Sequence, residues 1–239
     1  MLTHMFWAYG GFSRMEYMCA KSFIKNGYDL NIWTYGDCEN FIDGAQTKNA
    51  REIIDEKHVF LNSKGSYAGF SDLFRYMVLD QIGELYVDTD VFAIKHSREL
   101  PLKKFLVTER IRNGGYKING NVIYNPDPQN GNIINLAKNY SKNFRGEDIQ
   151  WGEIGPELLT FIVNSYSLHG FEIFPPDFAN PINWWECPSE LLSSSGINRL
   201  TDDTYFVHFY NEMWRRNSYD KNKINSMSTL YEILIKSLE

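Results

Sequence analysis

Residues 83–90 read GELYVDTD, in which a turn glycine and a mostly apolar strand lead into Asp88 and Asp90. An Asp-x-Asp triplet alone is common, so its position matters: ligands of open α/β sheets bind where strands end. Side chains alternate along a strand, so Asp88 and Asp90 can point the same way. Two carboxylates on one side, with phosphate oxygens and water completing the shell, suit Mg²⁺ or Mn²⁺. The alternative is a solvated acidic turn.

A helix is predicted directly before this strand. Ser71 can cap it, apolar residues recur at helical spacing as far as Ile82, and Gly83 ends it. Asp72 and Arg75 lie three residues apart on one face of this helix. By themselves they could be an ordinary helix salt bridge. Because only a short helix and strand separate them from the Asp-x-Asp, we interpret all four charged residues as one site.

The N-terminal third alternates strand and helix patterns. Strands are predicted at residues 4–8 and 30–35, with a short third strand at 59–61. Ser13 can cap a helix that ends near Asn26. A strand–helix–strand start favours a parallel sheet with a nucleotide site at the carboxyl ends of its strands.

Regular patterns continue beyond the Asp-x-Asp and then weaken. Strands are predicted at 105–108 and 122–124, and helices at 132–143 and 156–167. From Phe171 the pattern becomes irregular, until a strand at 205–210 and a closing helix at 224–238. The sequence contains no repeat and no linker. We therefore predict one α/β domain over residues 1–239.

Composition excludes several classes of protein. A net charge of −6 argues against nucleic-acid binding through a broad basic surface. An acidic protein that holds a diphosphate needs local positive charge, which a divalent cation supplies. Cys19, Cys38 and Cys187 form no CxxC pair, so neither disulfides nor a zinc site are expected. No signal peptide or membrane-length apolar run is evident, and we expect a cytoplasmic protein with at most peripheral membrane contact.

Residues 71–90 resemble the SDxxRyxxLyxxGGxYxDxD stretch of the DXD-sugar-binding glycosyltransferases. That family includes fungal initiating mannosyltransferases, capsular polysaccharide transferases, α-1,4-galactosyltransferases and, more distantly, large clostridial toxins. Glu84 departs from the pattern, which usually has a second glycine there. Weaker similarities to the family occur in the same order along the chain: Trp7, NGN at 119–121, GP at 155–156 and residues 208–214.

The resemblance implies a GT-A fold, which is a Rossmann-like mixed sheet flanked by helices. It also implies a UDP- or GDP-sugar donor, a glycan or glycoconjugate acceptor and a divalent cation. Carried across residue by residue, the catalytic residues would be Asp72 and Arg75 on the donor sugar, Asp88 facing the ribose and sugar, and Asp90 on the metal. His208 would join Asp88 and Asp90 at the metal, with Asn211 nearby. The implied donor-binding residues are Trp7, Ala8, Tyr9, Asp72, Arg75, Tyr76, Asp88, Thr89, Asn119, Asn121 and Trp214.

Some of these assignments have structural alternatives. His208 could equally be a packed core residue, and Trp214 could be core as well. If the reaction inverts configuration it needs a general base, for which Asp148 and Glu153 are the candidates in the sequence. Both could instead be carboxylates favoured by a helix N-terminus. Most relatives of this family retain configuration, and in a retaining enzyme neither Asp148 nor Glu153 would act as a general base.

Two other kinds of protein could carry a similar motif. A haloacid-dehalogenase-type phosphatase also has an Asp-x-Asp after a strand, but it requires Thr or Val where Phe92 stands, and its motif usually lies near the N-terminus. A catalytically inactive nucleotide-sugar or carbohydrate-binding module would have no need of intact Asp72, Arg75, Asp88 and Asp90. The sequence therefore favours a metal-dependent transferase.

Overall fold

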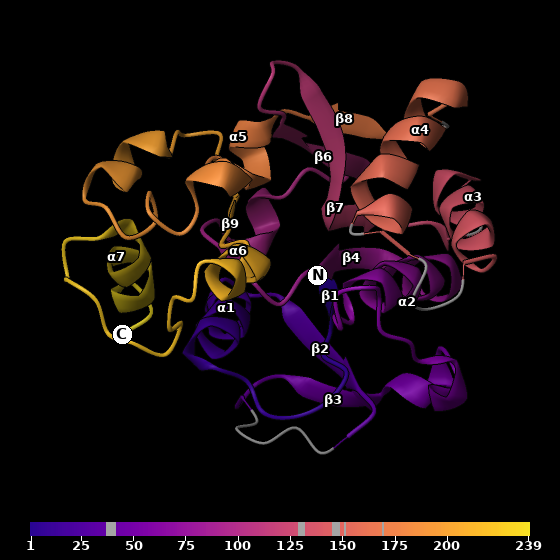
Figure 1. Ribbon diagram of the computed structural model, residues 1–239, viewed down its shortest axis with the longest axis horizontal. Coiled ribbons are helices and arrows are strands. Elements are labelled where there is room, and N and C mark those ends of the chain that lie inside the picture. The colour runs from indigo at the N-terminus through magenta and orange to yellow at the C-terminus, as the bar shows by residue number, and fades with distance from the viewer. Residues whose placement is uncertain (37–41, 129–131, 145–148, 151, 169) are drawn as a thin grey trace.

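The computed structural model describes the whole chain except residues 37–41, 129–131, 145–148, 151 and 169. Its main element is a seven-stranded sheet with the order β3-β2-β1-β4-β7-β6-β8 (Figure 1). β7 runs antiparallel to both of its neighbours, and the other pairs are parallel. The strands are β1 Leu2–Phe6, β2 Asp29–Thr34, β3 Gln46–Asn49, β4 Glu84–Val87, β6 Phe105–Arg110, β7 Tyr116–Asn125 and β8 Glu172–Phe174.

Helices cover both faces of this sheet, which confirms the predicted mixed α/β architecture (Figure 1). On one face, α2 (Ala68–Gln81), α3 (Asn132–Ser141) and α4 (Leu158–Ser165) bury an apolar cluster that includes Phe70 and Phe74. On the other face lie α1 (Arg14–Lys25) and α5 (Pro176–Ala179). Short helical turns complete this part of the chain: η1 Ala50–Glu52, η2 Glu56–His58, η3 Ser97–Glu99, η6 Glu153–Glu157, η7 Trp184–Glu186 and η8 Ser195–Arg199.

A second sheet positions the C-terminal part of the chain. β5 (Val91–Ala93) leaves the Asp-x-Asp loop and pairs antiparallel with β9 (Phe206–His208), with Val91 opposite His208. The N–H of Phe209 donates to the carbonyl of Asp90 at 2.8 Å. This pairing therefore joins residues more than a hundred positions apart directly at the loop.

The last helices pack against the start of the chain. α6 (Asn211–Arg216) and α7 (Leu230–Lys236) share a buried cluster with α1, to which Met15, Cys19 and Trp214 contribute. Cys19 and Cys187 are buried free thiols, and Cys38 lies outside the described residues. Within the described part of the chain, no helix has the length and apolar character that a membrane crossing requires.

Two predictions in the first half of the chain were wrong. The third strand is Gln46–Asn49 instead of residues 59–61, which follow η2 as irregular chain. β3 is a mostly exposed edge strand of polar residues, so it has no apolar pattern that could reveal it. The helix before β4 begins at Ala68, so Ser71 lies inside it and is not its cap.

The predicted boundaries also changed in the second half. The expected helix at 156–167 is the π-turn η6 followed by α4, because Gly155 has non-helical backbone angles before Pro156. The late strand ends at His208, since Tyr210 adopts a left-handed conformation (φ 51°) and α6 follows. The closing helix begins only at Leu230, where Thr229 caps it.

Candidate active site

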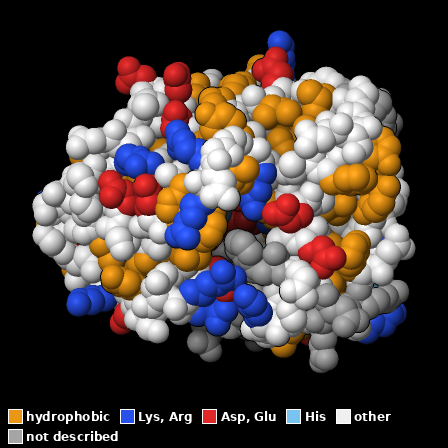
Figure 2. Space-filling model, turned by 45° about the horizontal axis from the view of Figure 1, so that its top comes forward, with side chains coloured by type: hydrophobic (Ala, Val, Ile, Leu, Met, Phe, Trp, Pro, Cys, Tyr) orange, Lys and Arg blue, Asp and Glu red, His pale blue; other side chains and the backbone are white. Residues whose placement is uncertain are grey.

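A cavity of about 430 Å³ opens where the central strands end. Its walls come from the end of β1, the start of α2, the β4–β5 loop, β6, β7, η7 and α6. Figure 2 shows the hollow near the middle of one face, with acidic side chains in its depth and both basic and acidic side chains around its mouth. The predicted position at the carboxyl ends of the strands is therefore where the cavity lies.

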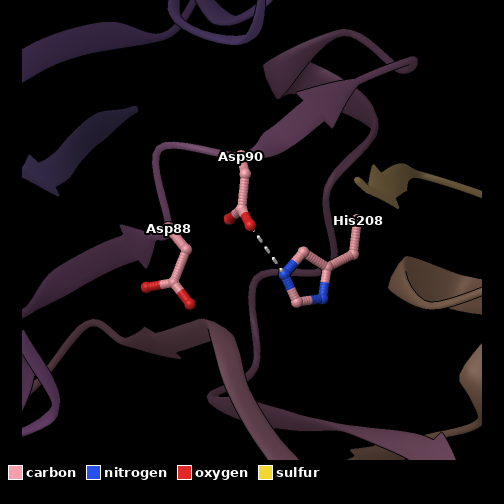
Figure 3. Close-up of side chains that lie close together, drawn as sticks. All are labelled: Asp88, Asp90 and His208. Carbon is pink, nitrogen blue, oxygen red and sulfur yellow. Dashed lines mark ion pairs between the residues drawn. The ribbon is translucent and has the colours of Figure 1, made fainter. Parts of the chain in front are cut away.

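Three potential metal ligands converge in this cavity. Asp88 and Asp90 flank the loop after β4, and His208 reaches toward them from β9 (Figure 3). One ligand atom from each lies within 4.8 Å of the others. His208 Nε2 lies 3.3 Å from Oδ2 of Asp90, and Asn211 donates its backbone N–H to the same oxygen at 2.7 Å. Asn211 thus approaches the acidic pair through its backbone.

The charges of this group are strongly coupled. Burial alone would raise the pKa of Asp90, but the charge and hydrogen bond of His208 and the N–H of Asn211 outweigh it and lower that pKa. Burial would lower the pKa of His208, but Asp90 outweighs it and raises that pKa. Burial raises the pKa of Asp88, opposed by Arg75 and reinforced by Asp90. Asp90 and His208 therefore each favour the charged form of the other, and a cation could take the place of a proton on His208.

The hydrogen bonds behind His208 orient its ring. Nδ1 of His208 lies 3.1 Å from Oδ1 of Asn180. That oxygen also accepts a hydrogen bond from Asn121 at 2.9 Å, and the amide nitrogen of Asn180 donates to the carbonyl of Thr108 at 3.0 Å. Since Oδ1 is an acceptor here, Nδ1 carries a proton and Nε2 can present its lone pair to the cavity. Such an anchored imidazole, with two carboxylates, fits a divalent cation.

Arg75 connects the helix to the acidic loop. It donates to Asp72 through Nη1 and to Asp88 through Nη2, each at 2.6 Å. Its guanidinium also lies 5.2 Å from the ring centroid of Tyr86. Burial raises the pKa of Asp72 to about 6, with Arg75 opposing and Asp88 adding to the effect. Asp72, Arg75, Asp88 and Asp90 all line the cavity, as one site requires.

Two glycines make room for this ion pair. A Cβ atom on Gly155 would lie 2.6 Å from Oδ2 of Asp72, and one on Gly120 would overlap Nη1 of Arg75. Gly120 and Gly155 therefore permit the close approach of β7 and η6 to α2. This close approach gives a physical reason for glycine in two of the weaker similarities to the family pattern, NGN at 119–121 and GP at 155–156.

Another part of the cavity is lined by the predicted nucleotide-binding residues. Trp7, Ala8 and Tyr9 follow β1 and line the cavity beside Tyr67. The Tyr9 and Tyr67 rings lie 5.7 Å apart, and the Tyr9 hydroxyl donates to Glu56 at 2.8 Å. Thr89 and Asn119 line the cavity as well.

Several predicted residues lie elsewhere. Tyr76, Asn121 and Trp214 are buried and are not among the described residues that line the cavity. Trp214 donates to the carbonyl of Phe209 at 2.9 Å and packs in the C-terminal core. Glu153 accepts a hydrogen bond from the N–H of Gln150 at 2.8 Å and is not a cavity residue in the described chain either. Asp148 lies outside the described residues.

The structure also adds residues that the sequence interpretation missed. Glu109, Trp184 and Tyr210 line the cavity, and Asn180 orients His208 from behind. Glu109 belongs to a strand that was predicted only as far as residue 108, so a longer strand would have placed it at the sheet edge. Asn180 directly follows the short helix α5 and Trp184 begins the short turn η7, and in neither place does a local sequence pattern indicate function.

Comparison with known families agrees with this geometry. A family model described as "Glycosyltransferase sugar-binding region containing DXD motif" matches residues 13–106. A second, described as "Alpha 1,4-glycosyltransferase conserved region", matches residues 132–235. Both family models describe glycosyltransferases, and they match successive parts of the chain. The two matched regions include Asp88 and Asp90 in the first and His208 in the second, so the cluster joins both of them.

Individual relatives agree with these matches. The chain is 25% identical over 154 residues to "Lactosylceramide 4-alpha-galactosyltransferase" of Rattus norvegicus, an alignment covering 59% of this chain and 40% of that protein. The protein of the same name from Homo sapiens is 26% identical over 154 residues, covering 59% and 41%. The chain thus spans well under half the length of these two relatives.

A solved structure supports the fold. The apo-form glycosyltransferase GlyE in Streptococcus pneumoniae TIGR4 superposes with a TM-score of 0.51 at 12% identity, covering 99% of this chain and 62% of that one. The chain therefore has the GT-A fold that its sequence implied.

Proposed function

We propose that this protein is a glycosyltransferase that transfers a hexose from a nucleotide-diphosphate sugar to a hydroxyl group of a glycan or glycoconjugate. The observation that carries the proposal is the adjacency, in one cavity, of the Asp88–Asp90–His208 cluster and the Asp72–Arg75 pair. The first is a set of metal ligands and the second a pair of polar groups suited to sugar oxygens. The curated relatives are named as galactosyltransferases, so UDP-galactose is the first donor to test.

Different side chains of the cavity would bind different parts of the donor. Asp88, Asp90 and His208 would hold the divalent cation, which supplies positive charge to the departing nucleoside diphosphate. The mixture of two carboxylates with an imidazole favours Mn²⁺ over Mg²⁺, which prefers oxygen ligands. Arg75, held between Asp72 and Asp88, orients donor oxygens with charge-assisted hydrogen bonds. Asp72 accepts hydrogen bonds from sugar hydroxyls and fixes the ring for attack.

The nucleoside has a separate place in this scheme. The aromatic wall of Trp7, Tyr9 and Tyr67 beside the end of β1 would receive the flat base. The cluster at the end of β4 would then lie beside the diphosphate, because β1 and β4 are neighbours in the sheet. The base would thus lie at the end of β1 and the diphosphate at the end of β4, in the order in which these groups follow one another in a nucleotide sugar.

The test combines donor binding with turnover. Mn²⁺ and UDP-galactose together should raise the melting temperature, because a ligand that binds only the folded state stabilises it by mass action. The same screen with GDP-mannose tests the other nucleotide. Asp90→Asn keeps the acceptor for the N–H of Asn211 but removes a charge, and should lower turnover at least about a hundredfold.

Asp203→Asn, at an exposed aspartate outside the cavity, is the matched control and should behave as the parent. Full activity of Asp90→Asn, or of the parent in excess EDTA, would contradict the metal-dependent mechanism. Donor binding without any transfer or donor hydrolysis would favour the inactive binding module instead.

A further inference from the structure

Part of the cavity wall has no role in donor binding as proposed above. The strand order β1-β4-β7-β6 sets the order of groups along the cavity. The aromatic wall proposed for the nucleoside follows β1 and the metal cluster follows β4, while Asn119 lies on β7 and Glu109 on β6. Trp184 of η7 lines the cavity as well. This region therefore lies on the side of the metal cluster away from the nucleoside, where a second substrate must approach.

Glu109 is a buried carboxylate with hydrogen-bonding capacity to spare. Its side chain is only 5% exposed, and Oε2 accepts hydrogen bonds from Asn119 at 2.8 Å and from the hydroxyl of Tyr210 at 3.3 Å. Oε1 faces the ammonium of Lys117 at 3.5 Å, while that ammonium lies closer to Glu157, at 3.0 Å. A carboxylate oxygen offers two acceptor sites, so Oε1 can still accept a hydroxyl hydrogen.

Tyr210 links this carboxylate to the metal cluster. Its ring lies 3.8 Å from that of His208, centroid to centroid, and its hydroxyl contacts both Glu109 and Asn180 at 3.3 Å. Glu109 is therefore one side chain away from a proposed metal ligand. A hydroxyl group held by Glu109 would lie next to the donor instead of at the rim.

Trp184 adds a flat apolar surface to the same region. Its indole is partly exposed and is fixed by Trp185, which packs edge-on at 5.5 Å, and by the guanidinium of Arg112 at 5.6 Å. A held aromatic ring loses little entropy when a ligand covers it. The apolar C–H face of a pyranose matches such a surface, and its hydroxyl groups match a carboxylate.

We propose that Glu109 and Trp184 form the acceptor subsite, in which a neutral pyranose packs on Trp184 and donates a hydroxyl hydrogen to Glu109. This inference rests on the proposed glycosyltransferase function. Neutrality follows from charge: an anionic acceptor would be desolvated beside Glu109 and near Asp88 and Asp90. Both residues are binding and positioning groups for the acceptor.

The experiment separates acceptor binding from donor binding. Methyl β-galactoside, methyl β-glucoside and methyl α-mannoside serve as neutral probes, and the methyl glycoside of glucuronic acid serves as the anionic one. Saturation-transfer NMR reports their binding to the Mn²⁺- and UDP-loaded protein, and transfer assays give the acceptor KM. Calorimetry with UDP and Mn²⁺ gives the donor-side Kd for each variant.

Glu109→Gln and Trp184→Ala should each raise the acceptor KM at least about tenfold, the loss of one good hydrogen bond or packing surface, while the Kd for UDP changes less than about twofold. Trp184→Tyr keeps an aromatic ring and should recover most of the affinity. Phe161→Ala, at an exposed aromatic residue of α4 outside the cavity, should match the parent in every assay.

The proposal is overturned if Trp184→Ala and Glu109→Gln leave the acceptor KM unchanged, or if they weaken UDP binding as much as acceptor binding. It is also overturned if the anionic glycoside binds as well as the neutral probes, or if only a hydroxyl-bearing peptide accepts the sugar. Failure of the parent protein to bind either UDP or GDP with Mn²⁺ would instead contradict the proposed function itself, so the two failures are distinguishable.

Discussion

Arg75 and Asp72 occupy space that two glycines leave open. Gly120 on β7 faces the guanidinium, and Gly155 in η6 faces the carboxylate of Asp72. Buried ion pairs require good geometry, because the cost of desolvating the charges is recovered only at short, well-directed contacts. Glycine at these two positions is therefore a condition for the Asp72–Arg75 pair and for the donor-sugar site proposed there, although neither residue carries a functional group.

Alanine at Gly120 should displace Arg75 from its contacts with Asp72 and Asp88. We expect Gly120→Ala to lower kcat/KM about a hundredfold, since small misplacements of positioning groups have effects of that size. The measurement is steady-state kinetics together with the melting temperature. Gly69→Ala, where the nearest atom to the new Cβ is 3.4 Å away, is the control and should keep parental activity. Equal kinetics for Gly120→Ala and the parent would disprove this packing argument.

His208 predicts how cation binding depends on pH. Its pKa is raised by Asp90, so the proton on Nε2 persists to higher pH than in a free histidine and competes with a cation. Affinity for Mn²⁺ should therefore increase with pH and level off above the pKa of His208, with about tenfold loss per pH unit below it.

Calorimetry with Mn²⁺ at about pH 6 and about pH 8 tests this dependence. His208→Gln removes the competing proton, so this variant should bind more weakly at the higher pH and show a much flatter pH dependence. Equal affinity of the parent at both values would show that His208 does not compete for the cation.

At the level of elements, the turn into β4 contains a strained residue. Gly83 and Glu84 both adopt positive φ, 81° and 67°. The second position is where the family pattern usually has glycine, and the structure shows that the turn keeps this conformation with glutamate in place. A non-glycine residue in the left-handed region costs on the order of 1 kcal/mol.

Glu84→Gly should therefore raise the free energy of unfolding by about 0.5–1 kcal/mol, since it relieves that strain. Urea denaturation measures the change. Gln46→Gly makes the same kind of change at the first residue of β3, which has ordinary φ, and should lower stability by about 0.5–1 kcal/mol. A destabilised Glu84→Gly would mean that side-chain contacts of Glu84 outweigh the strain.

The β5–β9 ladder shows how much of the site depends on short elements. Each strand has three residues, too few for a period-2 pattern to be distinctive, yet their register places His208 opposite Val91 and beside Asp90. Sequence patterns predicted the strand that carries His208 but did not predict β5, the strand with which it pairs. The pairing is a tertiary property and leaves no local pattern to read.

Across the whole molecule, the end of the chain returns to its beginning. α7 packs against α1, where Arg14 makes two hydrogen bonds to Glu232, at 2.6 and 2.9 Å (Figure 1). Lys221 contacts both Glu16 of α1 and Asn211, whose N–H binds Asp90. These contacts connect the C-terminal segment to the Asp-x-Asp loop as well as to the core.

Arg14→Met would leave Glu232, only 1% exposed, without its charged partner. We expect this change to lower the free energy of unfolding by about 3 kcal/mol, as for other half-broken buried ion pairs. Lys57→Met breaks the exposed pair with Asp55 and should change stability by less than about 0.5 kcal/mol. Urea denaturation of both variants distinguishes them, and equal effects would refute a structural role for the Arg14–Glu232 pair.

Local sequence was enough to specify the parts of the site that lie close together along the chain. The helix containing Asp72 and Arg75, the strand of residues 84–87 and the two aspartates after it lie within twenty-three residues, where hydrophobic periodicity and turn residues are informative. Composition and strand position together indicated a divalent cation, and the four charged residues do share one cavity.

Packing between distant segments selected the residues that complete the site. Asn180 and Trp184 come from segments without a distinctive pattern, Glu109 lies one residue beyond the predicted end of its strand, and Gly120 and Gly155 matter only because α2 lies against them. Edge strand β3 and the true start of α2 were missed because packing, not propensity, sets them. Local patterns record which face of an element is buried, but not which partner buries it.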